Sequence, residues 1–148
     1  MRENMGLFLG KRETDGKWVE GYLYPGIGQH KGKWFITVVD DCLTTSHTYA
    51  VISETIREFT GLSDKTGKGI FEGDIVERGD RIWVIEYDNM CAQFVMKTFT
   101  DRGVFWIRSF DLIPSEWCEV IGNKFDNPEL IKGGEKNGKN DVKGRTRQ

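Results

Sequence analysis

The stretch that first suggests chemistry is the glycine- and lysine-rich run at residues 61–74, "GLSDKTGKGIFEGD". A Walker A loop needs four residues between its glycines, then Lys, then Ser or Thr. Here five residues separate the first glycine from Gly67, and Gly69 follows Lys68. The G-x-G-x-x-G dinucleotide pattern also fails, because one residue too many precedes Gly73. The spacing therefore predicts no phosphate loop and no nucleotide cofactor.

The same residue types fit turn chemistry. Residues 64–67 begin with Asp and end with Gly, as a β-turn favours. Glycine adopts positive φ without steric cost, and Asp side chains accept hydrogen bonds from nearby backbone amides. We therefore predict a structural turn motif that starts the strand at residues 75–76. Its residues are Gly61, Asp64, Gly67, Glu72, Gly73 and Asp74.

The histidines and cysteines lack the spacing of metal ligands. Cys42 and His47 are five apart in an expected loop, and His30 stands alone. Cys91 and Cys118 form no C-x-x-C pair, which indicates free thiols in a reducing compartment. No pair of carboxylates stands out as an acid and a base. We expect no metal, no cofactor, no catalytic residue and no enzymatic activity.

The elements that carry these residues are expected to be short strands. The chain has 148 residues, 38% hydrophobic and 12% aromatic, which suits one soluble domain rich in β structure. Turn signals recur every eight to twelve residues or so, as in a small barrel or sandwich. The Asp15-Gly16 pair predicts a β-hairpin. Residues 49–59 fit either a strand or a short helical turn. Pro128 favours a helical turn that closes the domain.

We expect a single domain at residues 1–131, with 1–58 and 59–131 as its subdomains. Residues 132–148 hold six Lys or Arg and two Asp or Glu and almost nothing to bury, so a disordered basic tail is predicted. The net charge is −2 for the chain and therefore −6 for the rest, which gives no general attraction to nucleic acid. No signal peptide or long apolar run is visible, so we expect a cytoplasmic protein without a membrane partner.

Two expected strands have apolar side chains on both faces. In residues 81–87, Ile82 and Val84 alternate with larger apolar residues, and residues 104–110 repeat this pattern. A sheet with one solvated face would alternate apolar and polar residues instead. These strands need cover, from the N-terminal half of the chain, which we favour, or from another chain. The candidate interface residues are Trp83, Ile85, Tyr87 and Trp106.

Three long motifs resemble a known family. The pattern T-G-L-x-D-x-x-G-x-x-I-x-E-G-D-I-V matches residues 60–76, "CEVIGN" stands at 118–123, and "NPEL" stands at 127–130. With "KWVEGYL" near the start, the chain resembles the YopX family of phage and prophage proteins. Gly69 replaces a charged residue that is usual in the family, Ser53 replaces a common proline, and the basic tail is not typical.

The resemblance implies a mainly β fold, a bacterial phage or prophage source and self-association, and it carries over no catalytic residue. We expect a phage-derived accessory protein that acts as a non-enzymatic binding or self-associating module. A homo-oligomer is the expected assembly, and any other protein partner is left open. The alternative is a nucleic-acid-binding small β-barrel, in which aromatic residues stack bases and the basic tail holds phosphates.

Overall fold

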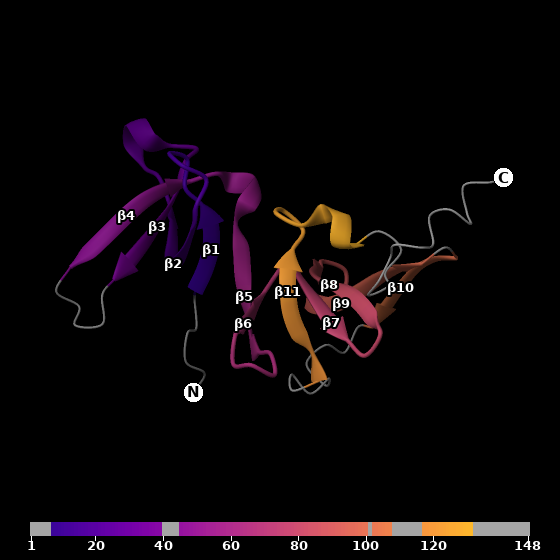
Figure 1. Cartoon of the computed structure of the whole chain (residues 1–148). Helices are drawn as coiled ribbons and strands as arrows, with labels where there is room; N and C mark the ends of the chain where they lie inside the picture. Colours follow the sequence, from indigo (N-terminus) through magenta and orange to yellow (C-terminus); the bar gives the residue numbers. More distant parts are fainter. Residues whose placement is uncertain (1–6, 40–44, 101, 108–116, 132–148) are drawn as a thin grey trace. The chain divides into compact units, whose positions relative to one another are not determined.

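The computed structural model describes residues 7–39, 45–100, 102–107 and 117–131, and it describes residues 105–107 by their backbone alone. The described chain consists of strands joined by tight turns and short 3-10 helices, which confirms the mainly β prediction (Figure 1). The strands are β1 (Leu7–Lys11), β2 (Trp18–Pro25), β3 (Trp34–Val39), β4 (Ser46–Val51), β5 (Arg57–Ser63), β6 (Gly69–Phe71), β7 (Asp74–Arg78), β8 (Arg81–Asp88), β9 (Gln93–Thr100), β10 (Gly103–Ile107) and β11 (Glu119–Asn123).

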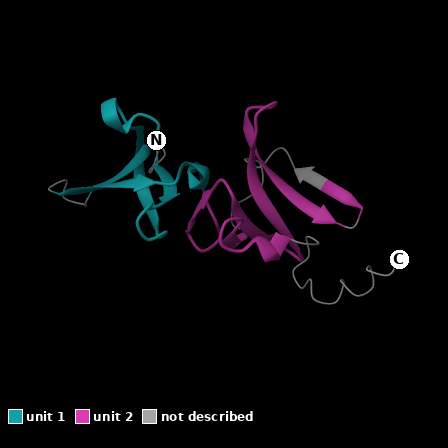
Figure 2. Ribbon diagram, turned by 90° about the horizontal axis from the view of Figure 1, so that it is seen from above, with its two compact units in different colours: residues 1–61 teal, residues 62–148 magenta. Residues whose placement is uncertain are grey.

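The strands form two antiparallel sheets, and neither closes into a barrel within the described residues. One sheet has the order β4-β3-β2-β1-β5-β6, and the other has the order β10-β9-β8-β7-β11. The chain divides into two compact units, residues 1–61 and 62–148, so the boundary falls inside β5 (Figure 2). The sequence analysis placed this boundary after residue 58. The predicted tail, residues 132–148, lies outside the described residues.

The first unit is a curled sheet built from the predicted hairpin. Gly16 has a φ of 72° in the turn between β1 and β2. The sheet coils until the end of β4 meets the end of β1, where the Ile52 amide donates to the Lys11 carbonyl (2.8 Å). Ile36 and Val51 are buried on the inner face of this coil. The 3-10 helix η2 (Ser53–Thr55) then leads into β5.

A glycine on β2 permits the tight curl. A Cβ built on Gly21 would overlap the Thr37 carbonyl oxygen and crowd the Ile36 side chain. Because the overlapped atom belongs to the backbone of β3, it cannot rotate away as a side chain could. The approach of β2 to β3 therefore depends on the missing side chain.

The second unit explains the two apolar faces of β8, whereas the side chains at 105–110 of the other such strand lie outside the described part. On one face of β8, Trp83 and Ile85 pack with a cluster whose other buried members are Ile70, Val76, Met96, Cys118 and Val120. On the opposite face, Ile82 and Val84 pack with Ile75, Phe99, Leu130 and Ile131. The last two belong to the 3-10 helix η5 (Pro128–Ile131), which begins at the predicted proline. Both faces of β8 are thus covered by residues of its own unit.

Some local expectations differ from the structure. The ambiguous residues 49–59 contain the end of β4, the single turn η2 and the start of β5, so both interpretations apply to different parts. The predicted loop at residues 40–47 ends earlier than expected, because β4 already begins at Ser46. Cross-strand pairing of Ser46 with Val39 and of His47 with Val38 extends β4 into the predicted loop.

We predict that Gly21→Ala lowers the free energy of unfolding by about 1–3 kcal/mol, as overpacking of a tight contact does. Chemical denaturation of the full chain would measure this. Gly16→Asn is the matched control, because Gly16 has open space around it and Asn tolerates positive φ. A Gly21→Ala variant as stable as the parent would contradict the close approach of β2 and β3.

Candidate functional site

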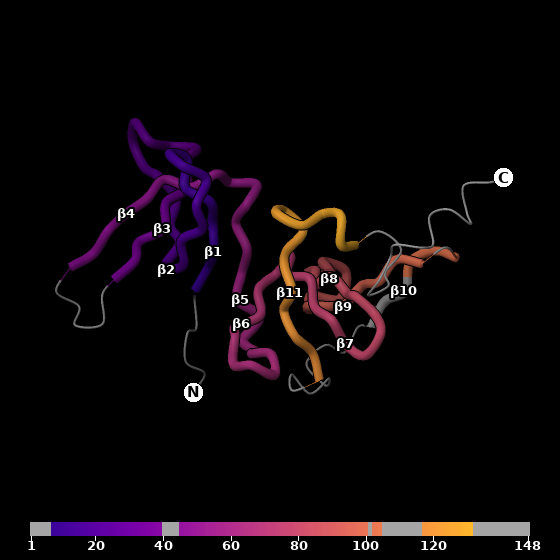
Figure 3. The backbone as a smooth tube through the Cα atoms, in the orientation of Figure 1, coloured from indigo at the N-terminus to yellow at the C-terminus, as the bar shows by residue number. Residues whose placement is uncertain are grey.

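The turn motif is organised around the buried carboxylate of Asp64, which is 5% exposed. Its Oδ1 accepts hydrogen bonds from the Thr66 amide (2.8 Å), the Thr66 hydroxyl (2.7 Å) and the Lys68 amide (3.0 Å). Its Oδ2 accepts one from the amide of Val120, 56 residues away on β11 (2.8 Å). The Lys65 amide also donates to the Cys118 carbonyl (3.0 Å). One side chain thus shapes the β5–β6 turn and attaches it to β11. Figure 3 traces the backbone of β5, β6 and β11.

Hydrogen bonding determines the charge state of this carboxylate. Burial alone would raise the pKa of Asp64, because it disfavours the ionised form. The Val120 amide, the Thr66 hydroxyl and the amides of Lys68 and Thr66 all donate to the carboxylate and outweigh burial. The pKa of Asp64 therefore lies below its usual value, and the group is ionised at neutral pH.

A second turn continues the network into β7. Gly73 has a φ of 87°, a conformation that glycine adopts without steric cost. Its amide donates to the Ile85 carbonyl (2.7 Å), and its carbonyl accepts from the Lys124 amide (2.9 Å). Asp74 Oδ2 accepts from the Phe71 amide (2.8 Å) and closes the turn. The turn between β6 and β7 is thus bonded to both β8 and the segment after β11.

The remaining motif residues have supporting positions. Gly61 and Gly67 have φ values of 91° and 90°, and the Gly67 amide donates to the Asp64 carbonyl (2.9 Å). Glu72 is half-buried next to Gly73. Five of the six motif residues therefore lie at two consecutive turns of the second unit. Gly61 is the exception, because it lies inside β5, at the end of the first unit.

The chemistry open to this centre is limited. The Asp64 oxygens are engaged by backbone and side-chain donors, which suits a structural role rather than proton transfer. The nearby Cys118 thiol is buried. Burial and, to a smaller extent, the negative charge of Asp64 raise the pKa of this thiol, so Cys118 is a weak nucleophile. Among the described residues, no group of three or more His, Cys, Asp or Glu could hold a metal ion.

The four candidate interface residues have different environments. Trp83 and Ile85 are buried in their own unit, so the expectation that they need cover from the N-terminal half or from another chain is corrected. Tyr87 is partly exposed, and its ring contacts the edge of Phe94 (centroids 5.2 Å apart). Trp106 lies in β10 opposite Lys97, and its side chain is outside the described part.

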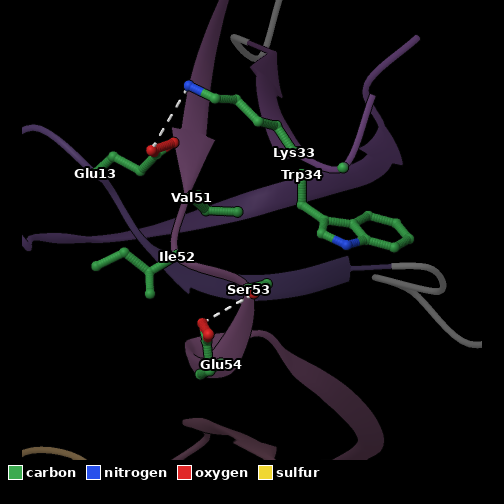
Figure 4. Close-up of a pocket in the computed structure, with 8 residues that line it drawn as sticks. Glu13, Lys33, Trp34, Val51, Ile52, Ser53 and Glu54 are labelled. Carbon is green, nitrogen blue, oxygen red and sulfur yellow. Dashed lines mark hydrogen bonds and ion pairs between the residues drawn. The ribbon is translucent and has the colours of Figure 1, made fainter. Parts of the chain in front are cut away.

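One surface pocket of the first unit is lined by polar side chains that already have interaction partners. It has a volume of about 230 Å³ and lies where β4 ends (Figure 4). Lys33 Nζ lies 3.9 Å from Glu13 Oε1, and the Ser53 hydroxyl donates to Glu54 Oε2 (2.9 Å). Trp34 and Val51 form its apolar wall. Because each carboxylate has a partner, the pocket has no group set apart for chemistry.

A second pocket of about 350 Å³ opens on the aromatic face of the same unit. Tyr24 and Phe35 line it with stacked rings 5.7 Å apart, and His30 meets Phe35 edge to face (5.9 Å). The sequence analysis did not select these residues. Tyr22 and Tyr24 alternate along one strand, which was a usable signal, but periodicity alone does not tell which face is buried.

These features define a class of protein: a strand-built chain of two antiparallel sheets, whose second unit is organised by a carboxylate-bound turn. Within this class, the chain belongs to the YopX family, since the family model described as YopX protein matches residues 8–132. No curated protein matches the chain. No helix among the described residues is long and apolar enough to span a membrane.

One solved structure that is similar to the chain is the crystal structure of protein EF1440 from Enterococcus faecalis. The two chains are 21% identical, and the superposition covers 84% of this chain and 96% of the other, with a TM-score of 0.38.

We predict that Asp64→Asn lowers the free energy of unfolding by about 2–3 kcal/mol at neutral pH, because hydrogen bonds to a charged acceptor are lost and a buried amide donor loses its partner. The pKa of Asp64 is depressed by folding, so its contribution is present above the unfolded pKa of about 4. It is lost as the pH falls through the folded pKa, and the difference between parent and variant should shrink there.

Urea denaturation at several pH values would measure this difference. Asp80→Asn is the matched control, because Asp80 is exposed in the β7–β8 turn. A stability difference for Asp64→Asn that stays constant from neutral pH to acid would contradict the assigned role of the ionised carboxylate.

We also predict that Gly73→Val destabilises the chain by about 1–3 kcal/mol, because a β-branched residue is strained at a φ of 87°. The melting temperature in circular dichroism should fall accordingly. Gly67→Asn is the comparison, since Asn accepts this conformation and nothing lies within 4 Å of the added Cβ. A fully stable Gly73→Val protein would refute the turn assignment.

Proposed function

We propose that this chain is a non-enzymatic accessory protein of phage or prophage origin that acts by binding and associates with copies of itself through β10. Membership of the YopX family supports the origin. The structural use of Asp64 by backbone amides supports a binding role over an enzymatic one. The bacterial cytoplasm is the proposed location, since the three cysteines of the sequence lack the spacing of a disulfide framework.

The observation that carries self-association is the character of the edge strand β10. Among the described strands only β9 pairs with it, so β10 ends the sheet. Its sequence, GVFWI, contains no charged residue, and its pairing with β9 is regular from Gly103 to Ile107. Val104 is 46% exposed. Edge strands with these properties readily pair with another chain.

The opposite edge of the same sheet is protected. β11 carries Glu119, and its register with β7 shifts between Val120 and Gly122. Charges and bulges on an edge strand prevent pairing with further strands. The contrast indicates that β10 is the edge adapted to a partner. Antiparallel pairing of β10 with β10 of a second copy would place the same residues on both sides of a two-fold axis.

We predict that Val104→Lys shifts the protein to a smaller assembly without unfolding it, because it introduces a charge at the proposed contact. Size-exclusion chromatography with light scattering would measure the mass, and circular dichroism would monitor the fold. Met90→Lys is the matched control, since Met90 is 95% exposed in the β8–β9 turn of the same sheet. Self-association itself fails if the parent protein is a monomer at micromolar concentration. The assignment to β10 fails if both variants keep the parental mass.

A further inference from the structure

The first unit presents aromatic side chains on its outer face. Tyr22 is opposite Thr37 and Tyr24 is opposite Phe35 in the pairing of β2 with β3. Paired residues of antiparallel strands project to the same face, so these side chains share one surface. Tyr22 and Tyr24 are 55% and 41% exposed. The buried Ile36 belongs to the other face, so the described core of the unit does not cover the aromatic residues.

The pocket at one end of this surface is preformed. It is bounded by the face of Phe35, by Tyr24 and by the loop that follows β2. The Gly26 amide donates to the Lys33 carbonyl (2.8 Å), and a Cβ on Gly26 would overlap the His30 carbonyl oxygen. The loop is therefore held close to the rings by its own backbone. A site of this kind binds without a large ordering cost.

The pocket combines aromatic rings with polar groups. Stacked Tyr24 and Phe35 provide the apolar surface, and His30 lies beside them. The hydroxyls of Thr37 and Thr48 lie 3.0 Å apart and hydrogen-bond the Tyr24 hydroxyl, which lowers the pKa of Tyr24. Hydroxyls can both donate and accept, as the edges of nucleobases require. An aliphatic side chain would use only the apolar part.

The spacing along β2 suits successive bases. Alternate residues on one face of a strand are roughly 7 Å apart, so Tyr22 and Tyr24 can each stack one base. At the far end of β2, about 20 Å away, Lys11 Nζ and the Arg57 guanidinium lie 5.2 and 4.4 Å from the centre of the Trp18 ring. Arg57 is buried beneath Trp18 (4% exposed), so Lys11 is the cation that this end of β2 can offer to a ligand.

From this arrangement we propose that the outer face of β2 and β3 binds single-stranded nucleic acid, with one base in the pocket at Phe35 and Tyr24 and the next base on Tyr22. The strand would run along β2 toward Lys11. Glu20 is exposed on the same face, because it pairs with Leu9 while Tyr22 pairs with Leu7. Its negative charge weakens phosphate binding and offers a test of the site.

The affinity of the full chain for a fluorescein-labelled 15-nucleotide oligo-dT would be measured by anisotropy at low salt. Tyr22→Ala and Tyr24→Ala should each weaken binding about tenfold, the loss expected for one stacked base. Binding should also weaken with salt, as phosphate contacts require. Thermal melting would check that each variant is folded. Unchanged affinity in folded Tyr22→Ala and Tyr24→Ala proteins would overturn the proposal.

Two Glu→Gln variants test the site without removing any packing contact. Glu20→Gln should tighten binding about two- to fivefold at low salt. Glu58→Gln is the matched control, since Glu58 is exposed and its pairing with Phe8 places it on the opposite face. Equal effects of the two substitutions would show that only the net charge matters and would overturn the site. Two other outcomes would also overturn the proposal. One is equal affinity for a duplex of the same length, and the other is binding of N-acetyl-tryptophanamide without binding of the oligonucleotide.

Discussion

The ionised carboxylate of Asp64 is the constraint on which the second unit depends. A buried charge is tolerated only where donors replace the lost water, and here four hydrogen bonds do so. Three of them shape the turn between β5 and β6, and the fourth attaches that turn to Val120 on β11. The side chain therefore joins segments that are far apart in the sequence. The neighbouring turn at Gly73 extends the same backbone network to β8.

This network allows β8, a strand with two apolar faces, to exist inside a small unit. With β11 and the turns held in place, Cys118 and Val120 cover one face of β8, and η5 covers the other. The apolar residues that suggested a missing partner are used for the core instead. The two surfaces that we propose for binding lie elsewhere. They are the uncharged edge β10 in the second unit and the aromatic face of β2 and β3 in the first.

The sequence predicted what depends on neighbouring residues. The turn at Asp64–Gly67, the turn at Gly73, the hairpin at Asp15-Gly16 and the helical turn at Pro128 all follow from local backbone preferences. The bond from Asp64 to Val120 could not be predicted, because it spans 56 residues and depends on how the strands are ordered. For the same reason, alternation showed that β8 has two apolar faces but not that η5 covers one of them. The aromatic face was missed because Tyr22 and Tyr24 suit a buried strand equally well.

The most direct test of this account is an NMR pH titration that follows the side-chain carboxyl carbon of Asp64 together with the amide of Val120. Hydrogen bonds to the ionised form predict that Asp64 titrates below the usual value of about 3.9. The Val120 amide should shift with the same midpoint, because it donates to this carboxylate. A midpoint at or above the usual value, or a Val120 amide that does not follow the titration, would contradict the central role of Asp64.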